Sequence, residues 1–271
     1  MSGEGVRDLS MAVWRWLATG GVNRRCVALL GGVLFFGVGL FPLVAADDRV
    51  FAIDVGHGGD RPSGDMANRT LSSPNNAKSA AGVLEKTLTL EFSRALAEAL
   101  QREGKRMGQG VVVRLTRSGD ENPDFAERVK RCSGKGPAPE VVVSIHFNAS
   151  STHRARGTVA MIAAADHNPS FDRDRALAVR ISRAASRGVQ KFLPDSSALA
   201  PITDSHLHGG KGSNLFYQLQ KHPVLRKVPA CFLEVEFLDR PDVDERLLKR
   251  RAEAFPVIAG EIARELLRRE E

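Results

Sequence analysis

The strongest constraint on the fold is a set of short apolar runs that alternate along the chain with helical patterns. Each run is rich in Val, Ile, Leu and Phe and is bounded by turn residues, which is typical of buried strands. The runs span residues 50–56, 111–117, 140–147, 158–164 and 230–237. Because strands that alternate with helices favour parallel pairing, we predict a single α/β domain: a mainly parallel, twisted sheet with helices on both faces.

Helical patterns fall between and after these runs. The clearest spans residues 85–100, where apolar side chains recur every four positions on one face. The others span 125–132, 174–189 and 245–267. We expect Pro256 to kink or divide the last of them, because proline removes a helical hydrogen bond. Gly, Pro, Ser and Asn predict loops over 60–81, 133–139 and 194–213.

The first 46 residues have the layout of a secretory signal peptide with a long amino-terminal region. Arg24 and Arg25 precede an uncharged run, 27–40, and small residues up to Ala46 offer a cleavage site. The run is shorter than the roughly 20 residues of a membrane span, which favours cleavage over a retained anchor. We therefore expect an exported, periplasmic chain whose catalytic domain is 47–271. The sequence leaves open the general secretory or the twin-arginine route.

The charge of the chain limits the kinds of binding partner to expect, and its cysteine content limits the disulfides. The formal net charge of +7 suits an anionic cell-wall polymer or a membrane surface. Export and the lack of a dense basic run argue against nucleic acid, and we expect a monomer. The domain would keep Cys132 and Cys231, for which two buried thiols are favoured over a disulfide.

Four polar residues stand at the ends of separate segments. His57 follows the first apolar run within Val-Gly-His-Gly-Gly, His146 ends the third and Glu234 lies in the last, while Glu85 opens the long helix. Ligands of open α/β sheets gather outside the carboxyl ends of strands, so we expect these side chains to meet. Two imidazoles and one carboxylate can hold zinc and leave a position for water. A second carboxylate beside that water completes a hydrolytic site.

Each of these residues also has an ordinary explanation. A single histidine after a strand is usually packed or hydrogen-bonded, and Glu85 could be a first-turn acid favoured by the helix dipole. Glu234 and Glu236 share one face of a strand, where two carboxylates repel unless a cation or proton intervenes. We expect one of them at the metal and the other nearer solvent. Salt bridges from both to nearby Arg or Lys remain the alternative.

The same segments resemble the zinc-dependent N-acetylmuramoyl-L-alanine amidases that cut bacterial peptidoglycan. The resemblance covers about residues 50 to 268, and its fragments occur in the family's order. They are Phe51–Gly59, Glu85-Lys86, Val113–Arg117 with Glu127-Arg128, Ser144–Asn148 and Pro229–Glu234. One such fragment is a moderate signal, whereas the full set in order is a strong one.

The resemblance implies residue roles and a reaction. It makes His57, Glu85 and His146 the ligands of one zinc ion per chain, and Glu234 the catalytic acid. The reaction would be hydrolysis of the amide between N-acetylmuramic acid and L-alanine, in cell-wall remodelling or daughter-cell separation. Asn148, two residues past His146, is a candidate substrate contact, or simply a cap for the strand end. The donor set favours zinc over manganese or cobalt.

Two departures from the family pattern bear on the site. Glu236 stands where the family usually has glycine, which leaves the choice of catalytic acid partly open in favour of Glu234. The gap between His57 and Glu85 is longer than usual, so we expect residues 61–80 to rim the cleft and shape substrate choice. A second insertion, 186–213, could cover the site until a protein activator moves it, as in related cell-division amidases.

Two other functions stay open from the sequence. One is a catalytically silent peptidoglycan-binding module, against which the presence of all four key residues argues. The other is a zinc peptidase that cuts within the stem peptide, which the reaction products would distinguish from an amidase.

Overall fold

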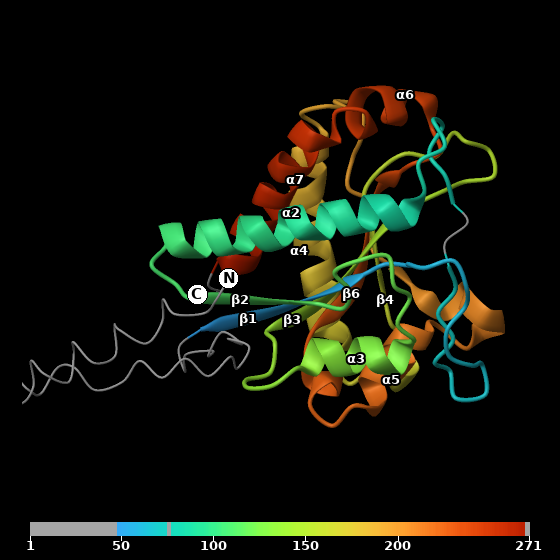
Figure 1. Ribbon diagram of the computed structural model, residues 1–271, viewed down its shortest axis with the longest axis vertical. Coiled ribbons are helices and arrows are strands. Elements are labelled where there is room, and N and C mark those ends of the chain that lie inside the picture. The colour runs from blue at the N-terminus through green and yellow to red at the C-terminus, as the bar shows by residue number, and fades with distance from the viewer. Residues whose placement is uncertain (1–47, 75–76, 269–271) are drawn as a thin grey trace, which may run out of the picture. The chain divides into compact units, whose positions relative to one another are not determined.

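The computed structural model describes residues 48–74 and 77–268, and the predicted signal peptide, 1–46, lies outside them. Six strands form one sheet in the order β2-β1-β3-β6-β4-β5 (Figure 1). They are β1 (Arg49–Val55), β2 (Val111–Leu115), β3 (Val141–Asn148), β4 (Val159–Ile162), β5 (Ile202–Thr203) and β6 (Ala230–Phe237). Neighbouring strands are parallel except β4 and β6. The predicted fold class, a mainly parallel sheet in one α/β domain, is confirmed.

The four predicted helices occur in the predicted order, but α5 and α6 were not predicted and the last predicted helix starts too early. The helices are α2 (Glu85–Arg106), α3 (Phe125–Ser133), α4 (Phe171–Val189), α5 (Asn214–Lys221), α6 (Pro241–Val243) and α7 (Arg251–Leu267). The single helix predicted over 245–267 is wrong at its start, because a π-helical turn, Asp244–Leu248, precedes α7. Pro256 does not divide α7 but lies inside it. The loop predicted over 194–213 contains β5 and a 3₁₀ segment, Asp204–Gly210.

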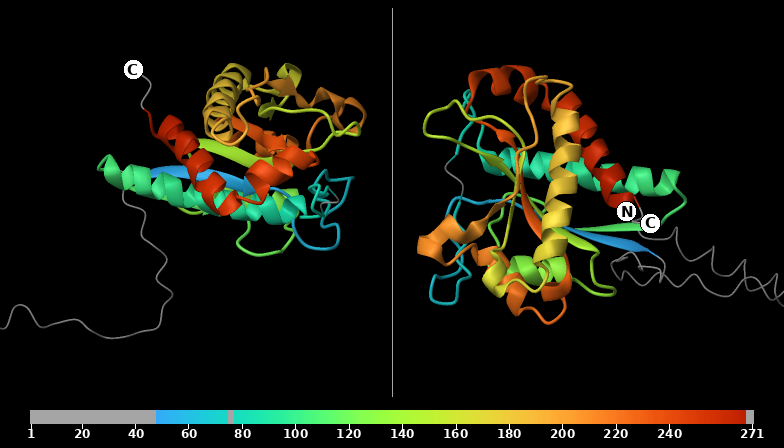
Figure 2. Two further views of the ribbon diagram at one scale, coloured as in Figure 1. Left: turned by 90° about the horizontal axis from the view of Figure 1, so that it is seen from above. Right: turned by 180° about the vertical axis from the view of Figure 1, so that it is seen from behind.

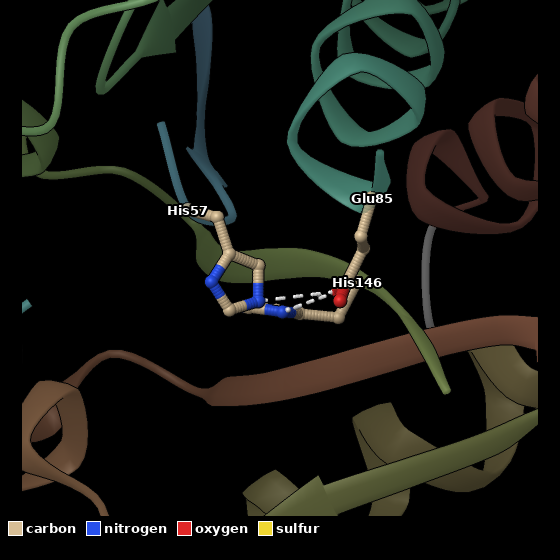
Figure 3. Close-up of side chains that lie close together, drawn as sticks. All are labelled: His57, Glu85 and His146. Atoms are coloured by element: carbon tan, nitrogen blue, oxygen red, sulfur yellow. Dashed lines mark hydrogen bonds and ion pairs between the residues drawn. The ribbon is translucent and has the colours of Figure 1, made fainter. Parts of the chain in front are cut away.

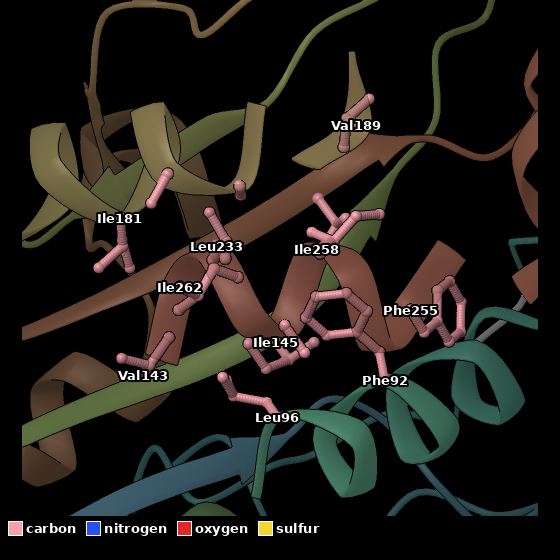
Figure 4. Close-up of a cluster of buried hydrophobic side chains, with 14 of the residues drawn as sticks. Phe92, Leu96, Val143, Ile145, Ile181, Val189, Leu233, Phe255, Ile258 and Ile262 are labelled. Carbon is pink, nitrogen blue, oxygen red and sulfur yellow. The ribbon is translucent and has the colours of Figure 1, made fainter. Parts of the chain in front are cut away.

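Alternation along the strands places two separate cores on the two sheet faces. Phe51, Ile145 and Leu233 belong to the larger core, where α2, α4 and α7 pack together on one face (Figures 2 and 4). Val142 and Phe232 belong to the smaller core, together with residues of α3 and α5. Each fully buried large apolar side chain contributes about 1.5–3 kcal/mol to folding, so both cores stabilise the packing of the helices on the sheet.

The same alternation decides where the polar residues point. His146 has the parity of Val142 on β3, and Glu234 has the parity of Phe232 on β6, so both belong to the smaller-core face. The strands β1, β3 and β6 are neighbours and parallel, so their carboxyl ends lie along one edge. The site therefore forms at that edge. Within the described ranges, none of the helices combines the length and apolarity needed to cross a membrane.

Candidate active site

The structure brings His57, Glu85 and His146 together from three separate elements (Figure 3). Oε1 of Glu85 lies 3.3 Å from Nε2 of His57 and 3.1 Å from Nδ1 of His146. One ligand atom from each of the three lies within 4.8 Å of the other two. A tetrahedral zinc ion with bonds of about 2.0–2.1 Å holds its ligands about 3.3 Å apart. The donor set and its spacing therefore fit zinc.

Glu85 is held in the site from both sides. It is the first residue of α2, and its Oε1 accepts a hydrogen bond from the backbone N–H of Phe147 at 3.1 Å. Burial alone would raise the pKa of Glu85, but hydrogen bonds with His146 and His57 outweigh it and hold that pKa well below the usual range. The carboxylate is therefore ionised at neutral pH, as a metal ligand must be.

His57 adopts a strained backbone conformation that its surroundings impose. Its φ is 58°, in the left-handed region that costs a residue with a side chain about 1–2 kcal/mol. Nη2 of Arg128 donates to the carbonyl of His57 at 2.7 Å, and Nη2 of Arg117 donates to that of Gly56 at 2.9 Å. Both arginines are 1 % exposed. These buried donors fix the turn that aims the imidazole at Glu85.

Gly56 is required by the close approach of β1 to β3. A Cβ atom at this position would lie 2.4 Å from the carbonyl oxygen of Ile145 and 2.6 Å from Cε1 of His146. No side chain fits there without displacing the imidazole. The glycine thus lets the segments that carry His57 and His146 lie side by side.

A buried ion pair beneath the site was not foreseen from the sequence. Nη1 of Arg128 lies 2.9 Å from Oδ1 of Asp54, and both side chains are 1 % exposed. Hydroxyls of Thr116 and Ser144 also donate to Asp54. Burial raises the pKa of Asp54, but the charge of Arg128 and these hydrogen bonds outweigh burial and lower it. In the sequence, Arg117 and Arg128 stood out only as parts of the fragments that resemble the family. No local pattern around them indicates which strand end they support.

Glu234 lies beside the three candidate ligands. It is paired in register with His146 across β3 and β6, and its Oε2 is buried without a hydrogen-bond partner among the described residues. Burial raises the pKa of Glu234 to about 7; the charge of His146 opposes this rise and that of Glu85 adds to it. A carboxyl group with a pKa near neutral suits a residue that takes up and returns a proton.

Glu236 is in a different environment, although it is only two residues away. It is completely buried, and its Oε1 accepts hydrogen bonds from the backbone N–H groups of Gly157 at 2.7 Å and Phe237 at 2.9 Å. The hydroxyl of Ser196 donates to its other oxygen. The expectation that one acid of the pair lies nearer solvent is therefore wrong for Glu236. The loop after β3 and the segment after α4 close over it, which strand alternation alone could not predict.

Asn148 and the two cysteines have local roles. Oδ1 of Asn148 accepts from the backbone N–H of Ala149 at 2.8 Å, and its carbonyl accepts from Leu238, so this residue caps the strand end. A substrate contact through Asn148 stays a prediction. Cys132 and Cys231 are both buried and free, in line with the favoured reading.

The two predicted insertions differ in how far they belong to the fold. Residues 186–213 begin inside α4, contribute β5 to the sheet and supply Ser196 to Glu236, so much of this segment is structural. A covering role for it stays a prediction. The first insertion, 61–80, contacts α5 and the segment before it through Arg69 and Asn214.

Comparison with known proteins places the chain in a family. A family model described as N-acetylmuramoyl-L-alanine amidase matches residues 51–264, and the chain belongs to that family. The protein is thus a peptidoglycan amidase. No curated protein sequence matches the chain.

Solved structures of amidases share the fold. N-acetylmuramoyl-L-alanine amidase AmiC2 of Nostoc punctiforme aligns with a TM-score of 0.55 and 21% identity, over 81% of this chain and 95% of that one. An N-acetylmuramoyl-L-alanine amidase from Clostridium difficile 630 aligns with a TM-score of 0.54 and 19% identity, over 82% and 96%. The CwlD amidase from Clostridioides difficile, solved in complex with the GerS lipoprotein, aligns with a TM-score of 0.52 and 17% identity, over 81% and 96%.

Proposed function

We propose that this amidase is an exported zinc enzyme that hydrolyses the amide bond between N-acetylmuramic acid and L-alanine during cell-wall remodelling or daughter-cell separation. The observation that carries the proposal is the convergence of His57, Glu85 and His146 beside Glu234. These three would hold the ion, and an ion bound there would polarise the scissile carbonyl and acidify a water molecule.

The remaining steps belong to the side chains. Glu85 stays ionised and orients both imidazoles, while Arg117 and Arg128 keep the His57 turn in place. Glu234, with a pKa near neutral and one unpartnered oxygen, would take a proton from the attacking water and deliver it to the leaving amine of L-alanine. Phe232 packs against the ring of His146, and Phe216 packs against Phe232; because both phenylalanines are buried in the smaller core, they would hold that imidazole in place.

Export and regulation are supported from outside the site. The signal-like order of residues 1–46 supports a periplasmic location after cleavage near Ala46, where the substrate lies. A protein activator acting near 186–213 is supported by the complex of the similarly folded CwlD amidase with GerS. We propose that the chain acts as a monomer that finds peptidoglycan through its own catalytic domain.

Digestion of purified sacculi tests this function. The protein is incubated with sacculi with and without a chelator, and the soluble products are identified by mass spectrometry. We expect intact stem peptides that begin with a free L-alanine amine, released only when zinc is present. Fragments cut inside the stem peptide would instead indicate a zinc peptidase, and binding without any product would indicate a silent wall-binding module.

A further inference from the structure

A cavity of about 510 Å³ lies on the smaller-core face of the sheet, and the residues that line it do not include His57, Glu85 or His146. Phe216 lines it and packs edge to face on Phe232 at 5.0 Å between ring centroids; Phe232 in turn lies 5.0 Å from the ring of His146. One row of three rings thus connects the cavity with the metal-ligand histidine. Both phenylalanines are buried, so the row is not a path for substrate; it places the cavity two ring contacts away from His146.

The wall of the cavity is built by three segments that are far apart in sequence. The first insertion contributes Arg69, and residues 163–166 follow β4. The third segment is the stretch from Asp204 into α5, which runs beside the first insertion in Figures 1 and 2. The side chains that matter are Arg69, Asp166, Asp204, Lys211, Phe216 and Tyr217.

Arg69 is fixed in this wall by neutral partners alone. Its Nε donates to Oδ1 of Asn214 at 3.2 Å, and its Nη2 donates to the carbonyls of Gly212 at 2.8 Å and Ser213 at 3.1 Å. The guanidinium carbon also lies 4.2 Å from the ring centroid of Tyr217. Throughout 48–74 and 77–268, no acidic side chain forms a salt bridge with Arg69. Its charge is held in one orientation but is not neutralised.

The acids of the cavity do not neutralise Arg69 either. Oδ1 of Asp204 accepts from the backbone N–H of Ala164 at 2.9 Å, and its Oδ2 accepts from that of Ser213 at 2.6 Å. Asp204 is buried and fully occupied by these backbone donors. Asp166 is exposed, so water screens its charge. Lys211, also in the lining, adds a second cation.

We propose that Arg69 binds a carboxylate of the stem peptide, so that the insertion 61–80 makes the enzyme selective for stems with free carboxyl groups. This inference rests on the proposed function for the identity of the ligand. A rigid guanidinium with an unused edge suits a carboxylate, since charge-assisted hydrogen bonds are the strong ones and the arginine is already ordered. The stem peptide is the part of the substrate that continues beyond the scissile amide. The cavity is separated from His146 by two ring contacts of 5.0 Å each, a distance that about three extended residues span.

Direct binding tests the proposal without relying on turnover. The full chain carrying Glu234→Gln is titrated by calorimetry with a synthetic stem tripeptide whose carboxyl groups are free, and with the same peptide fully amidated. We expect the free acid to bind roughly 10-fold or more tightly than the amide, because one charge-assisted hydrogen bond is lost. Arg69→Gln should weaken binding of the free acid by a similar factor and leave the amide unchanged.

Lys221 provides a matched control. Its ammonium lies 4.5 Å from the centroid of the same Tyr217 ring, yet it lines a different surface depression. Lys221→Gln should therefore leave both affinities within about 2-fold, as expected for an exposed charge that does not line the cavity. The proposal would be overturned if Arg69→Gln and Lys221→Gln weakened binding of the free acid equally. It would also be overturned if Arg69→Gln bound the free acid as tightly as wild type. Competition by inorganic phosphate as strong as that by the peptide would overturn the assignment to a stem carboxylate.

A second variant and a second substrate keep the outcomes separate. Arg69→Lys retains the positive charge but not the planar guanidinium, so its affinity for the free acid should lie between those of wild type and Arg69→Gln. If Arg69→Gln melts at a much lower temperature than wild type, Arg69→Lys replaces it in the binding test. Wild-type hydrolysis of free and amidated muropeptides reports on the function itself. Absence of hydrolysis from both would sink the proposed amidase mechanism, whereas hydrolysis that shows no preference for free carboxyls, in wild type and Arg69→Gln alike, would sink only the carboxylate subsite.

Discussion

Glu234 and Glu236 stand two residues apart on β6, yet they differ in whether hydrogen bonds occupy both of their carboxylate oxygens. Glu236 is completely buried, and backbone and hydroxyl donors occupy both of its oxygens. Glu234 is partly buried, faces His146 across the strand pair, and leaves one oxygen without a hydrogen-bond partner in the described ranges. One carboxylate therefore organises loops, and the other is left available for a proton.

The comparison shows that strand parity is a weak guide to function at the end of a sheet. Both glutamates have the parity that points to the cleft face, but the pairing of β3 with β6 shifts by a bulge between His146 and Asn148. Beyond the bulge, Gly157 and Ser196 approach the strand and surround Glu236. The structural role of Glu236 is indicated by its satisfied hydrogen bonds more than by the face of the strand on which it lies.

The largest expected effect comes from removing the proton acceptor. Glu234→Gln keeps the shape of the side chain but cannot exchange a proton, so kcat for release of stem peptides should fall by about 10²–10⁴-fold. The melting temperature should stay near that of wild type, because no hydrogen bond of the unpartnered oxygen is lost. Steady-state kinetics and thermal unfolding on the same preparation check both parts. Nearly normal turnover would remove Glu234 from the mechanism.

A third carboxylate, Asp54, sharpens the comparison because it is buried and paired with a cation. Asp54→Asn leaves Arg128 buried without its counter-charge and should lower the free energy of unfolding at pH 7 by about 3 kcal/mol. The folded-state pKa of Asp54 is lowered, so its contribution is present above the unfolded value near 3.8 and is lost as the pH falls through the folded pKa.

Urea unfolding at several pH values checks this sign. The difference between wild type and Asp54→Asn should be constant from about pH 6 to 8 and should shrink below about pH 4. A difference that grows on acidification would show that Asp54 is protonated in the folded protein, contrary to the ion pair with Arg128.

The smallest effect is expected at Glu236. Glu236→Gln can still accept from Gly157 and Phe237 through its amide oxygen, and Ser196 can reverse its hydroxyl to accept from the new amide. The free energy of unfolding should fall by about 1–2 kcal/mol, while kcat should change by less than about 5-fold. Chemical unfolding and kinetics on sacculi measure these quantities. A loss of activity as large as that of Glu234→Gln, in a protein that still folds, would reverse the assignment of the two acids.

Sequence patterns were sufficient for five of the six strands, for α2, α3, α4 and α7, and for the candidate site residues, but not for β5, α5 or α6. Apolar runs mark β1, β3 and β6, and the polar residue in or just after each run is a local feature. The convergence of His57, His146 and Glu85 follows from parallel pairing, because neighbouring carboxyl ends share an edge.

Contacts over long separations could not be predicted in the same way. Arg128 reaches Asp54 across 74 positions, Ser196 reaches Glu236 across 40, and Arg69 reaches Asn214 across 145. Such contacts depend on how loops close after the sheet has formed, and no periodicity encodes them. They decide which acid is structural and which cation is left without a counter-charge.

The most direct test of the site is a zinc-binding titration of five variants. The full chain is titrated with zinc in competition with a chromophoric chelator, as wild type and with His57→Ala, Glu85→Gln, His146→Ala, Glu234→Gln or Glu236→Gln. We expect one tight zinc per chain in wild type and in both Glu234→Gln and Glu236→Gln, and its loss in the other three. Tight zinc in any of those three, or its loss in Glu234→Gln alone, would contradict a metal held by His57, Glu85 and His146 with Glu234 as the proton carrier.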